Sequence, residues 1–323
     1  MRARSRNPPE NSPPLVSALI GLAWILIYIV LIAPVFIFST LGGQWLGRVV
    51  WPGASPIFHG ITWIFGVFLI TWLIRVKANR RAWSQIGLPR PQLSRLVLGG
   101  LAGLSLILLA SLLEYKLGWL HVARVDTSLH RGVSKPLWIV LALLPSLAVG
   151  FSEELAFRGY VFQTLAERLP VWLAALLMSV VFALAHFSLS GFNVAFVVAV
   201  TVMSLVFLSL RFASGSLWFA IGFHGAWDWT QTYLVGLATT GTGNDPALVQ
   251  IRQTGPSFWV GSQQATEGGA LFLLMEISVL ILALAYAASI DRSPPWTQRL
   301  REDETNPQRP LGEAGRSVAA QSE

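Results

Sequence analysis

Long apolar stretches separated by short polar segments make up most of the chain. A helix needs about 20 predominantly apolar residues to cross a bilayer, and about eight stretches have that character. They span about 15–38, 57–74, 96–113, 136–169, 171–186, 192–210, 216–235 and 269–289. The pattern predicts an all-α polytopic membrane protein with about eight transmembrane helices.

The segments between the stretches predict how the helices are connected. A Gly- and Pro-rich connection over 41–56 is expected between the first two helices. The turn between the fourth and fifth helices is expected at Leu169-Pro170, because proline does not continue a helix. The longest connection, 236–268, is expected on the outer side of the membrane.

The two ends of the chain differ from its helical part. Residues 1–14 and 291–323 are polar and rich in arginine and proline, a composition typical of disordered tails. Residues 15–290 are predicted to form one transmembrane domain, and its segment 136–236 holds the candidate motifs described below. The sequence shows no internal repeat and no soluble domain.

Charged residues are scarce, and their placement predicts the orientation of the protein. They make up 12% of the chain, against about 25% in soluble domains. The segment 75–95 is rich in Lys and Arg and has no acidic residue. The positive-inside rule therefore places this segment and both termini in the cytoplasm.

The same charges bear on partners and location. The net charge of +7 reflects orientation in the lipid bilayer rather than a nucleic-acid partner, because the basic residues lie in the tails and one loop. The chain has no cysteine, which excludes disulfides and thiolate metal ligands. We expect an integral membrane protein of a bacterial inner (plasma) membrane.

Glu153, Glu154 and Arg158 interrupt the apolar fourth helix, whereas Glu167 and Arg168 near its end are expected to emerge into water. Charges at membrane depth are costly and are usually functional or paired. Glu154 and Arg158 lie four residues apart, hence on one helical face, and are expected to form a pair. Glu153 lies about 100° around the helix and is expected to face elsewhere.

Histidines on two other helices are expected to meet these charges. If the fourth and fifth helices form a hairpin, Glu153 and His186 each lie roughly 25 Å from its tip, at equal depth. On the seventh helix, His224 and Asp228 are four residues apart and share one face. The site is therefore predicted between helices four, five and seven.

A carboxylate beside an imidazole at equal depth is a general-base arrangement, so Glu153 and His186 are candidate catalytic residues. His224 and Asp228 are candidates for orienting a carbonyl or stabilising an oxyanion. An ionised Asp228 would oppose an oxyanion, so this residue must be protonated or must act by holding His224.

The pattern resembles a known family. Three motifs carry the likeness: Glu153-Glu154-x-x-x-Arg158, Phe182-x-x-x-His186 and His224-x-x-x-Asp228. In order and spacing they are similar to those of the CAAX-protease and bacteriocin-processing (CPBP) family of intramembrane glutamic endopeptidases. The resemblance implies that Glu153 and His186 activate water, with His224 and the residue at 228 at the oxyanion.

The resemblance leaves the substrate and the metal content open. Family members that cleave prenylated CAAX proteins carry Asn where this chain has Asp228, so the expected substrate is only a membrane-associated protein or peptide. A zinc ion held by the four candidate residues is an alternative, although the His-Glu-x-x-His spacing is absent. We expect no metal and no other cofactor.

Two other functions remain as alternatives. A proton- or ion-coupled transporter would use the same carboxylates and histidines as a relay, but transporters often show inverted repeats. A catalytically idle membrane protein could bind a partner through the long external loop or the tails.

Overall fold

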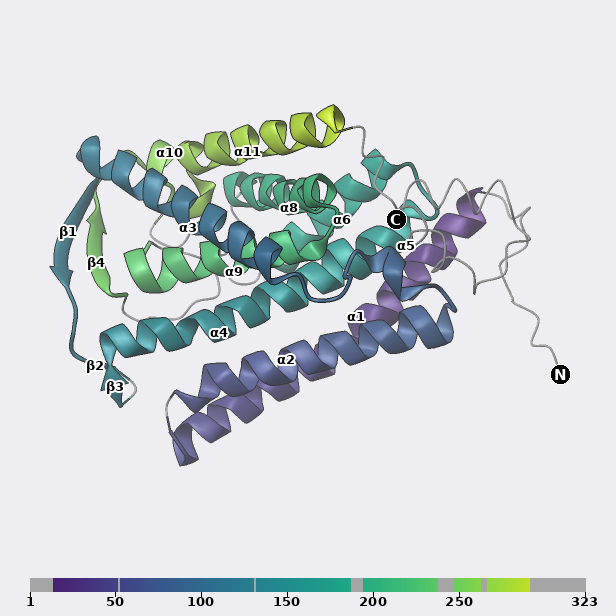
Figure 1. Cartoon of the computed structure of the whole chain (residues 1–323), viewed down its shortest axis with the longest axis horizontal. Helices are drawn as coiled ribbons and strands as arrows, with labels where there is room; N and C mark the ends of the chain where they lie inside the picture. Colours follow the sequence, from purple (N-terminus) through teal and green to yellow (C-terminus); the bar gives the residue numbers. More distant parts are fainter. Residues whose placement is uncertain are drawn as a thin grey trace, which may run out of the picture.

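A computed structural model of the protein describes residues 14–51, 53–130, 132–186, 194–237, 247–262 and 266–290. In this part of the chain, long helices lie side by side, and two small sheets stand at one end of the bundle (Figure 1). The architecture is all-α apart from those sheets. The expected disordered tails lie outside the described residues, except for Pro14.

The helices carry the labels of Figure 1. They are α1 (Pro14–Val49), α2 (Ala54–Trp72), α3 (Leu93–Lys116), α4 (Lys135–Glu153), α5 (Phe162–Ala166), α6 (Val171–Ala185), α8 (Val194–Ser214), α9 (Leu217–Trp229), α10 (Ser257–Val260) and α11 (Ala270–Ser289). The π-helical segments η1 (Leu73–Ala78), η3 (Glu154–Val161) and η4 (Thr230–Val235) continue α2, α4 and α9. Two short 3-10 helices are η2 (Trp83–Ile86) and η5 (Thr266–Gly268).

Six helices of the described chain are long and apolar enough to cross a membrane, so the protein is an integral membrane protein. They are α1, α2, α3, α8 and α11, together with the continuous run from α4 through η3 to α5. The two other expected helices are also present: α9 with η4 covers 217–235, close to the expected 216–235, whereas α6 is shorter. α6 has 15 residues, about 22 Å of helix, against about 30 Å of hydrocarbon core.

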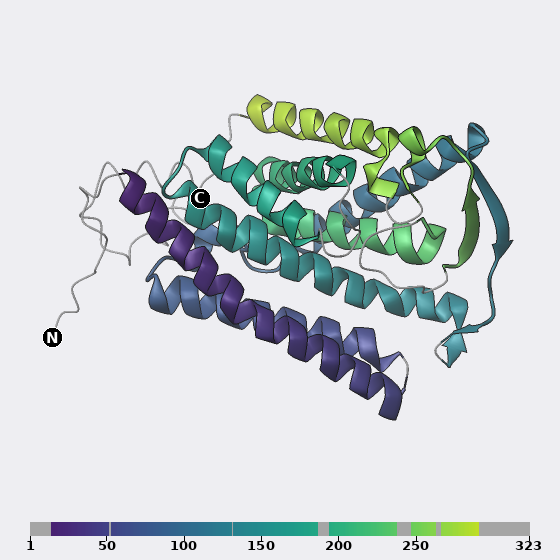
Figure 2. The same cartoon turned by 180° about the vertical axis from the view of Figure 1, so that it is seen from behind.

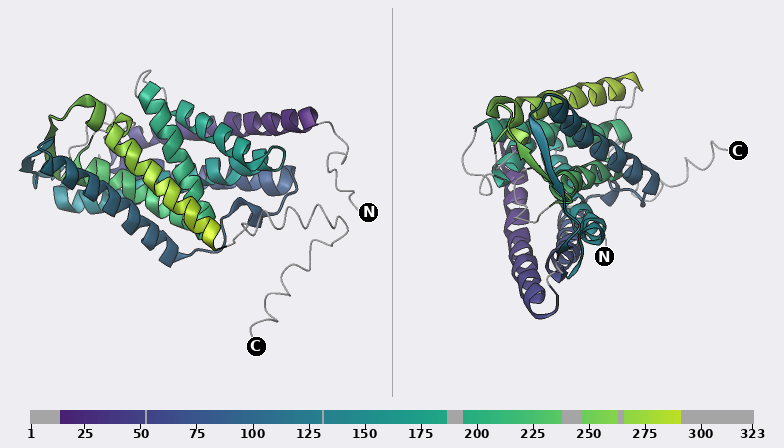
Figure 3. Two further views of the ribbon diagram at one scale, coloured as in Figure 1. Left: turned by 90° about the horizontal axis from the view of Figure 1, so that it is seen from above. Right: turned by 90° about the vertical axis from the view of Figure 1, so that its left-hand side faces the viewer.

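The expected connection over 41–56 is wrong, because α1 continues through it to Val49. Gly42 lies where α1 and α2 approach closely, and an added Cβ there would come 2.7 Å from the Phe58 ring. This glycine therefore allows helix packing rather than a turn. The α1–α2 hairpin projects from the rest of the bundle (Figure 3).

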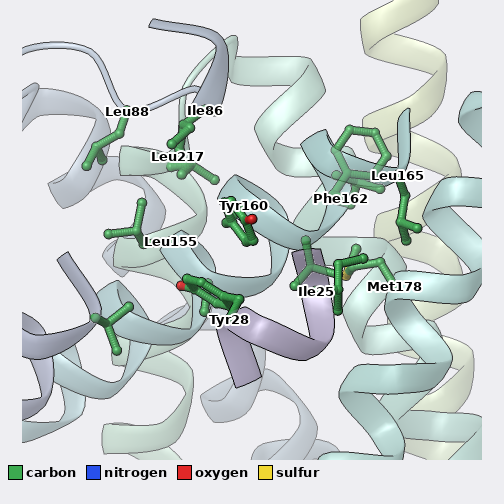
Figure 4. Packing of buried hydrophobic residues seen from close by; sticks show 14 of the residues in the cluster. Ile25, Tyr28, Ile86, Leu88, Leu155, Tyr160, Phe162, Leu165, Met178 and Leu217 are labelled. Atoms are coloured by element: carbon green, nitrogen blue, oxygen red, sulfur yellow. The ribbon is translucent and has the colours of Figure 1, made fainter. Parts of the chain in front are cut away.

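A hydrophobic cluster joins the α1–α2 hairpin to η3, α5 and α6 (Figure 4). Within it, the rings of Tyr28 on α1 and Tyr160 on η3 stack with their centroids 4.2 Å apart. The Tyr28 hydroxyl also lies 2.7 Å from Oγ1 of Thr71 on α2. These contacts hold one face of η3 and leave its opposite face for the polar residues.

The segment between α3 and α4 pairs with part of 236–268, the connection expected on the outer side, to form a sheet. β1 (Leu120–Val125) lies antiparallel to β4 (Val249–Gln253), with an irregularity between Val122 and Arg124. A second small sheet joins β2 (Leu129–His130) and β3 (Val133–Ser134). Both sheets stand at the end of the bundle opposite to the start of α1 (Figure 2).

An ion pair anchors the start of α4 beside these sheets. The Lys135 ammonium lies 3.3 Å from Oδ2 of Asp126. Hydrogen bonds from the hydroxyl and backbone N–H of Ser128, with the Lys135 charge, hold the pKa of Asp126 well below its ordinary value. The carboxylate is therefore ionised at neutral pH and fixes the first turn of the helix that carries Glu153.

α4 and α9 approach closely just before the charged residues. An added Cβ at Gly150 of α4 would lie 2.9 Å from the backbone nitrogen of Gly225 on α9. Glu154 follows Gly150 by one turn, and His224 immediately precedes Gly225. The absence of a side chain at this crossing therefore lets Glu154 and His224 meet.

We expect Gly150→Ala to destabilise the protein by about 1–3 kcal/mol, because the added methyl group meets rigid backbone. Thermal unfolding in detergent measures the effect. Gly100→Ala is the matched control, since its added Cβ would meet neighbouring atoms only at 3.7 Å. Equal unfolding temperatures for the two variants would show that the α4–α9 crossing is not tightly packed.

Candidate active site

Glu153 and Glu154 lie where the helix changes from α4 to the π-helical segment η3. π-helical turns in an α-helix are rare and are frequently found at functional sites. The two neighbouring carboxylates have different surroundings: the Glu153 side chain is 19% exposed, whereas that of Glu154 is fully buried. Of the two, only Glu153 has an exposed part of its side chain, although its Oε2 is buried.

Glu154 joins a cation of its own helix to a histidine of α9. Nη1 of Arg158 donates to Oε1 of Glu154 over 2.9 Å, as expected for a pair four residues apart. The same oxygen lies 3.0 Å from Nδ1 of His224. Because both Glu154 and Arg158 are fully buried, this contact is shielded from water.

Aromatic rings enclose the cation and the histidine. The Arg158 guanidinium lies over Phe182 of α6, 4.1 Å from the ring centroid, and over Phe207 of α8, at 4.8 Å. Phe207 also stacks on His224, with ring centroids 4.4 Å apart and 15° between the planes. α6 and α8 thus supply walls that hold both groups in one orientation.

His186 directly follows α6 and faces Glu153. Its Nδ1 lies 2.8 Å from the carbonyl oxygen of Phe182, which can only accept a hydrogen bond. This contact assigns a proton to Nδ1 and directs Nε2 towards the site. Nε2 lies 3.7 Å from Oε2 of Glu153, too far for a direct hydrogen bond but close enough for both to contact one water.

His224 has carboxylates at both ring nitrogens. Nδ1 contacts Glu154, as described above, whereas Nε2 lies 3.4 Å from Oδ2 of Asp228 and 3.8 Å from Oε2 of Glu153. The ring is buried, while the Asp228 side chain is 32% exposed. If both ring nitrogens carry a proton, Nδ1 can donate to Glu154 and Nε2 can face the carboxylates of Asp228 and Glu153.

The structure brings all six predicted site residues together between η3, α6 and α9, with Glu153 at the end of α4. Glu153 and His186 face each other across 3.7 Å, in agreement with the equal depth expected for them in the hairpin. His224 reaches the same level because the turn between α5 and α6 extends further along the bundle than the turn before α9 (Figure 1). The six residues are Glu153, Glu154, Arg158, His186, His224 and Asp228.

The zinc alternative stays a prediction, because it requires at least three donors around one centre. In the described part of the chain, no three or more His, Asp or Glu residues are arranged to hold a metal ion. Glu154 contacts Nδ1 of His224, whereas Nε2 of His224 and Nε2 of His186 both face Oε2 of Glu153, at 3.8 and 3.7 Å.

Arg211 also belongs to this region, although it lies in none of the three motifs. Arg211 at the end of α8 is buried, and its guanidinium donates to the carbonyl oxygen of Arg158 and to that of Gln85, the latter over 3.2 Å. It therefore ties η3 to the segment that follows α2. A lone arginine ending an apolar helix was the available signal, but it is also typical of a simple helix terminus.

The basic segment after α2 is also more than a determinant of orientation. Arg75 is buried and forms an ion pair with Glu167, which was expected to emerge into water. That expectation is wrong, because the Glu167 side chain is only 4% exposed. Burial alone would raise the pKa of Glu167, but the charges of Arg75, Arg81 and Arg168 lower it below its ordinary value.

The position of these residues in the chain agrees with a family comparison. Residues 135–230 match the family described as type II CAAX prenyl endopeptidase, Rce1-like. This segment is a CAAX-protease domain. It runs from the first residue of α4 to the first residue of η4 and contains all six site residues.

The match confirms the family predicted from the three motifs. CAAX proteases of this family are glutamate-dependent intramembrane proteases, so the CAAX-protease domain makes the protein an enzyme that acts on proteins or peptides. Neither a curated protein nor a solved structure matches the chain.

Proposed function

We propose that the protein is an intramembrane endopeptidase that hydrolyses a peptide bond in a membrane-associated protein or peptide, with Glu153 as the general base. The observation that carries this proposal is the pair formed by Glu153 and His186. Both side chains are about one-fifth exposed, and the bare Nε2 of His186 faces the Glu153 carboxylate at 3.7 Å. One water molecule can donate a hydrogen bond to each of them.

The proposed reaction uses that water as the nucleophile. Its oxygen attacks the carbonyl carbon of the scissile bond while Glu153 takes a proton, which gives a tetrahedral intermediate with a negative oxygen. Glu153 then returns the proton to the leaving nitrogen, and the C–N bond breaks. His186 orients the water through the lone pair on Nε2, since the Phe182 carbonyl holds the proton on Nδ1.

His224 is the proposed donor to the negative oxygen. Glu154 fixes the ring through Nδ1, and the contacts of Nε2 with Asp228 and Glu153 are long, at 3.4 and 3.8 Å. A substrate oxygen can therefore take the Nε2–H at a shorter distance. Preorganised donors of this kind are often the largest contribution to catalysis.

Asp228 acts in this scheme by holding His224 through Nε2 before the substrate binds, and His224 then donates this N–H to the oxyanion. We therefore expect Asp228→Asn to keep cleavage within about tenfold of wild type, because the amide oxygen still accepts from Nε2. Asp228→Leu removes the acceptor, and a lost hydrogen bond to a charged group costs about 1.5–3 kcal/mol. The rate of cleavage of one fluorogenic peptide by both variants measures the difference. Equal rates for the two would contradict the holding role.

The orientation in the membrane follows from the charges. We propose that the end of the bundle with Arg75, Arg81, Arg90 and Arg95 faces the cytoplasm. α1 begins and α11 ends at this end (Figure 1), which is consistent with both termini in the cytoplasm. The proposed location is a bacterial inner membrane.

The proposal is tested with purified protein in liposomes that contain membrane peptides. Mass spectrometry of the products should find cleaved peptides with wild-type protein and none with His186→Gln. Proton uptake by the same liposomes without cleavage would favour the transporter. The partner-binding alternative would be favoured by two results together: the liposomes show neither cleavage nor proton uptake, and deleting the long external loop abolishes the protein's role in cells.

A further inference from the structure

A pocket of about 460 Å³ lies between α3, α8, α9 and α11, away from the candidate active site. We call it the α11 pocket. Its walls are mainly apolar and include Leu210, Phe219, Val279 and Ala283. Its volume lies within the range of about 300–1,000 Å³ that is typical of small-molecule sites.

The α11 pocket opens towards the bilayer. Leu282 and Tyr286 on α11 line it and are both strongly exposed. In a helix that crosses the membrane, such exposed positions contact lipid. An occupant can therefore enter from the lipid without passing through water, and the apolar walls favour a hydrocarbon chain.

A cation lies at one end of the pocket. Arg95 begins α3 in the basic segment, is partly buried, and lines the pocket beside the turn between α8 and α9. Among the described residues, its guanidinium has no hydrogen-bond or ion-pair partner, unlike the buried Arg75, which pairs with Glu167. A guanidinium matches the geometry of a phosphate group and can bind it with two parallel hydrogen bonds.

We propose that the α11 pocket binds one anionic phospholipid, with an acyl chain in the pocket and the headgroup phosphate against Arg95. The apolar walls and the Arg95 guanidinium together select a lipid. The walls do not suit a free phosphate, and an apolar chain alone would not need the cation. Arg95 lies at the basic end of the bundle, where the negatively charged lipids of the cytoplasmic leaflet would be within reach. The bound lipid would brace α3 and α11 around α8 and α9.

Native mass spectrometry of detergent-purified protein tests the proposal with phosphatidylglycerol and phosphatidylcholine of equal acyl chains. We expect one phosphatidylglycerol to bind about tenfold more tightly than phosphatidylcholine, a difference of about 1.4 kcal/mol. Arg95→Gln should reduce this preference to about twofold or less. Arg90→Gln is the matched control, because Arg90 is an exposed arginine of the same segment that does not line the pocket, and it should leave the preference unchanged.

A second variant tests whether the chain occupies the pocket. Ala213→Phe adds a ring to the lining, and it should weaken the binding of both lipids. The proposal is overturned if the wild type binds the two lipids alike, if Arg95→Gln keeps the full preference, or if Ala213→Phe binds as the wild type does. It is also overturned if inorganic phosphate at millimolar concentration displaces phosphatidylglycerol.

Discussion

Replacing Glu153 by glutamine is expected to lower the rate of peptide-bond cleavage by roughly 10²–10⁴-fold, the usual contribution of a general base. Glutamine keeps the size of the side chain but cannot take a proton from the water proposed to bridge it and His186. The side chain is partly exposed, and Oε2 of Glu153 has no short hydrogen bond to lose. The variant should therefore fold as the wild type does, and the rate should fall without a lower unfolding temperature.

The matched control is Glu276→Gln, which makes the same change in a buried glutamate of α11, outside the site. We expect this variant to cleave the same peptide at close to the wild-type rate. The general-base role would be wrong if Glu153→Gln kept more than about a tenth of the wild-type rate. It would also be wrong if the two variants lost activity equally.

Replacing Arg158 by methionine is expected to destabilise the protein by about 3–5 kcal/mol, because it breaks a fully buried ion pair and leaves His224 as the remaining charged partner of Glu154. Methionine keeps an unbranched side chain between the rings of Phe182 and Phe207, so most of the loss arises from the charge. Thermal or denaturant unfolding in detergent measures it.

The double variant Glu154→Gln/Arg158→Met separates the charge effect from the packing effect. It removes both buried charges, so it should recover at least half of the stability that Arg158→Met loses. The double variant should cleave peptides more slowly than the wild type, because glutamine holds Nδ1 of His224 less strongly than a carboxylate does. A double variant that is less stable than Arg158→Met would contradict a buried ion pair at this position.

The predictions from sequence that held depend on local helix geometry. Glu154 with Arg158, and His224 with Asp228, are each four residues apart, and a helical repeat fixes such pairs wherever the helices pack. The equal depth of Glu153 and His186 in the bundle followed from the number of residues between each of them and the turn at Leu169-Pro170. No knowledge of distant contacts was needed for these inferences.

The features that sequence did not reveal depend on contacts between distant parts of the chain. α4, α5, α6, α8 and α9 lie between β1 and β4 in the chain, and neither strand is long enough to stand out alone. The burial of Glu167 depends on Arg75 from another helix, and the role of Arg211 depends on a carbonyl oxygen of η3. The change from α4 to η3 itself has no marker in the residue pattern.

The most direct test of the central claim compares the peptides in membranes of cells that carry the wild type, Glu153→Gln or His186→Gln. The proposed mechanism predicts a set of new peptide termini that is present with the wild type and missing with both variants. Restoring the wild-type gene should bring those termini back. Identical peptides in all three membranes, with the three proteins present at equal levels, would contradict hydrolysis by the Glu153–His186 pair.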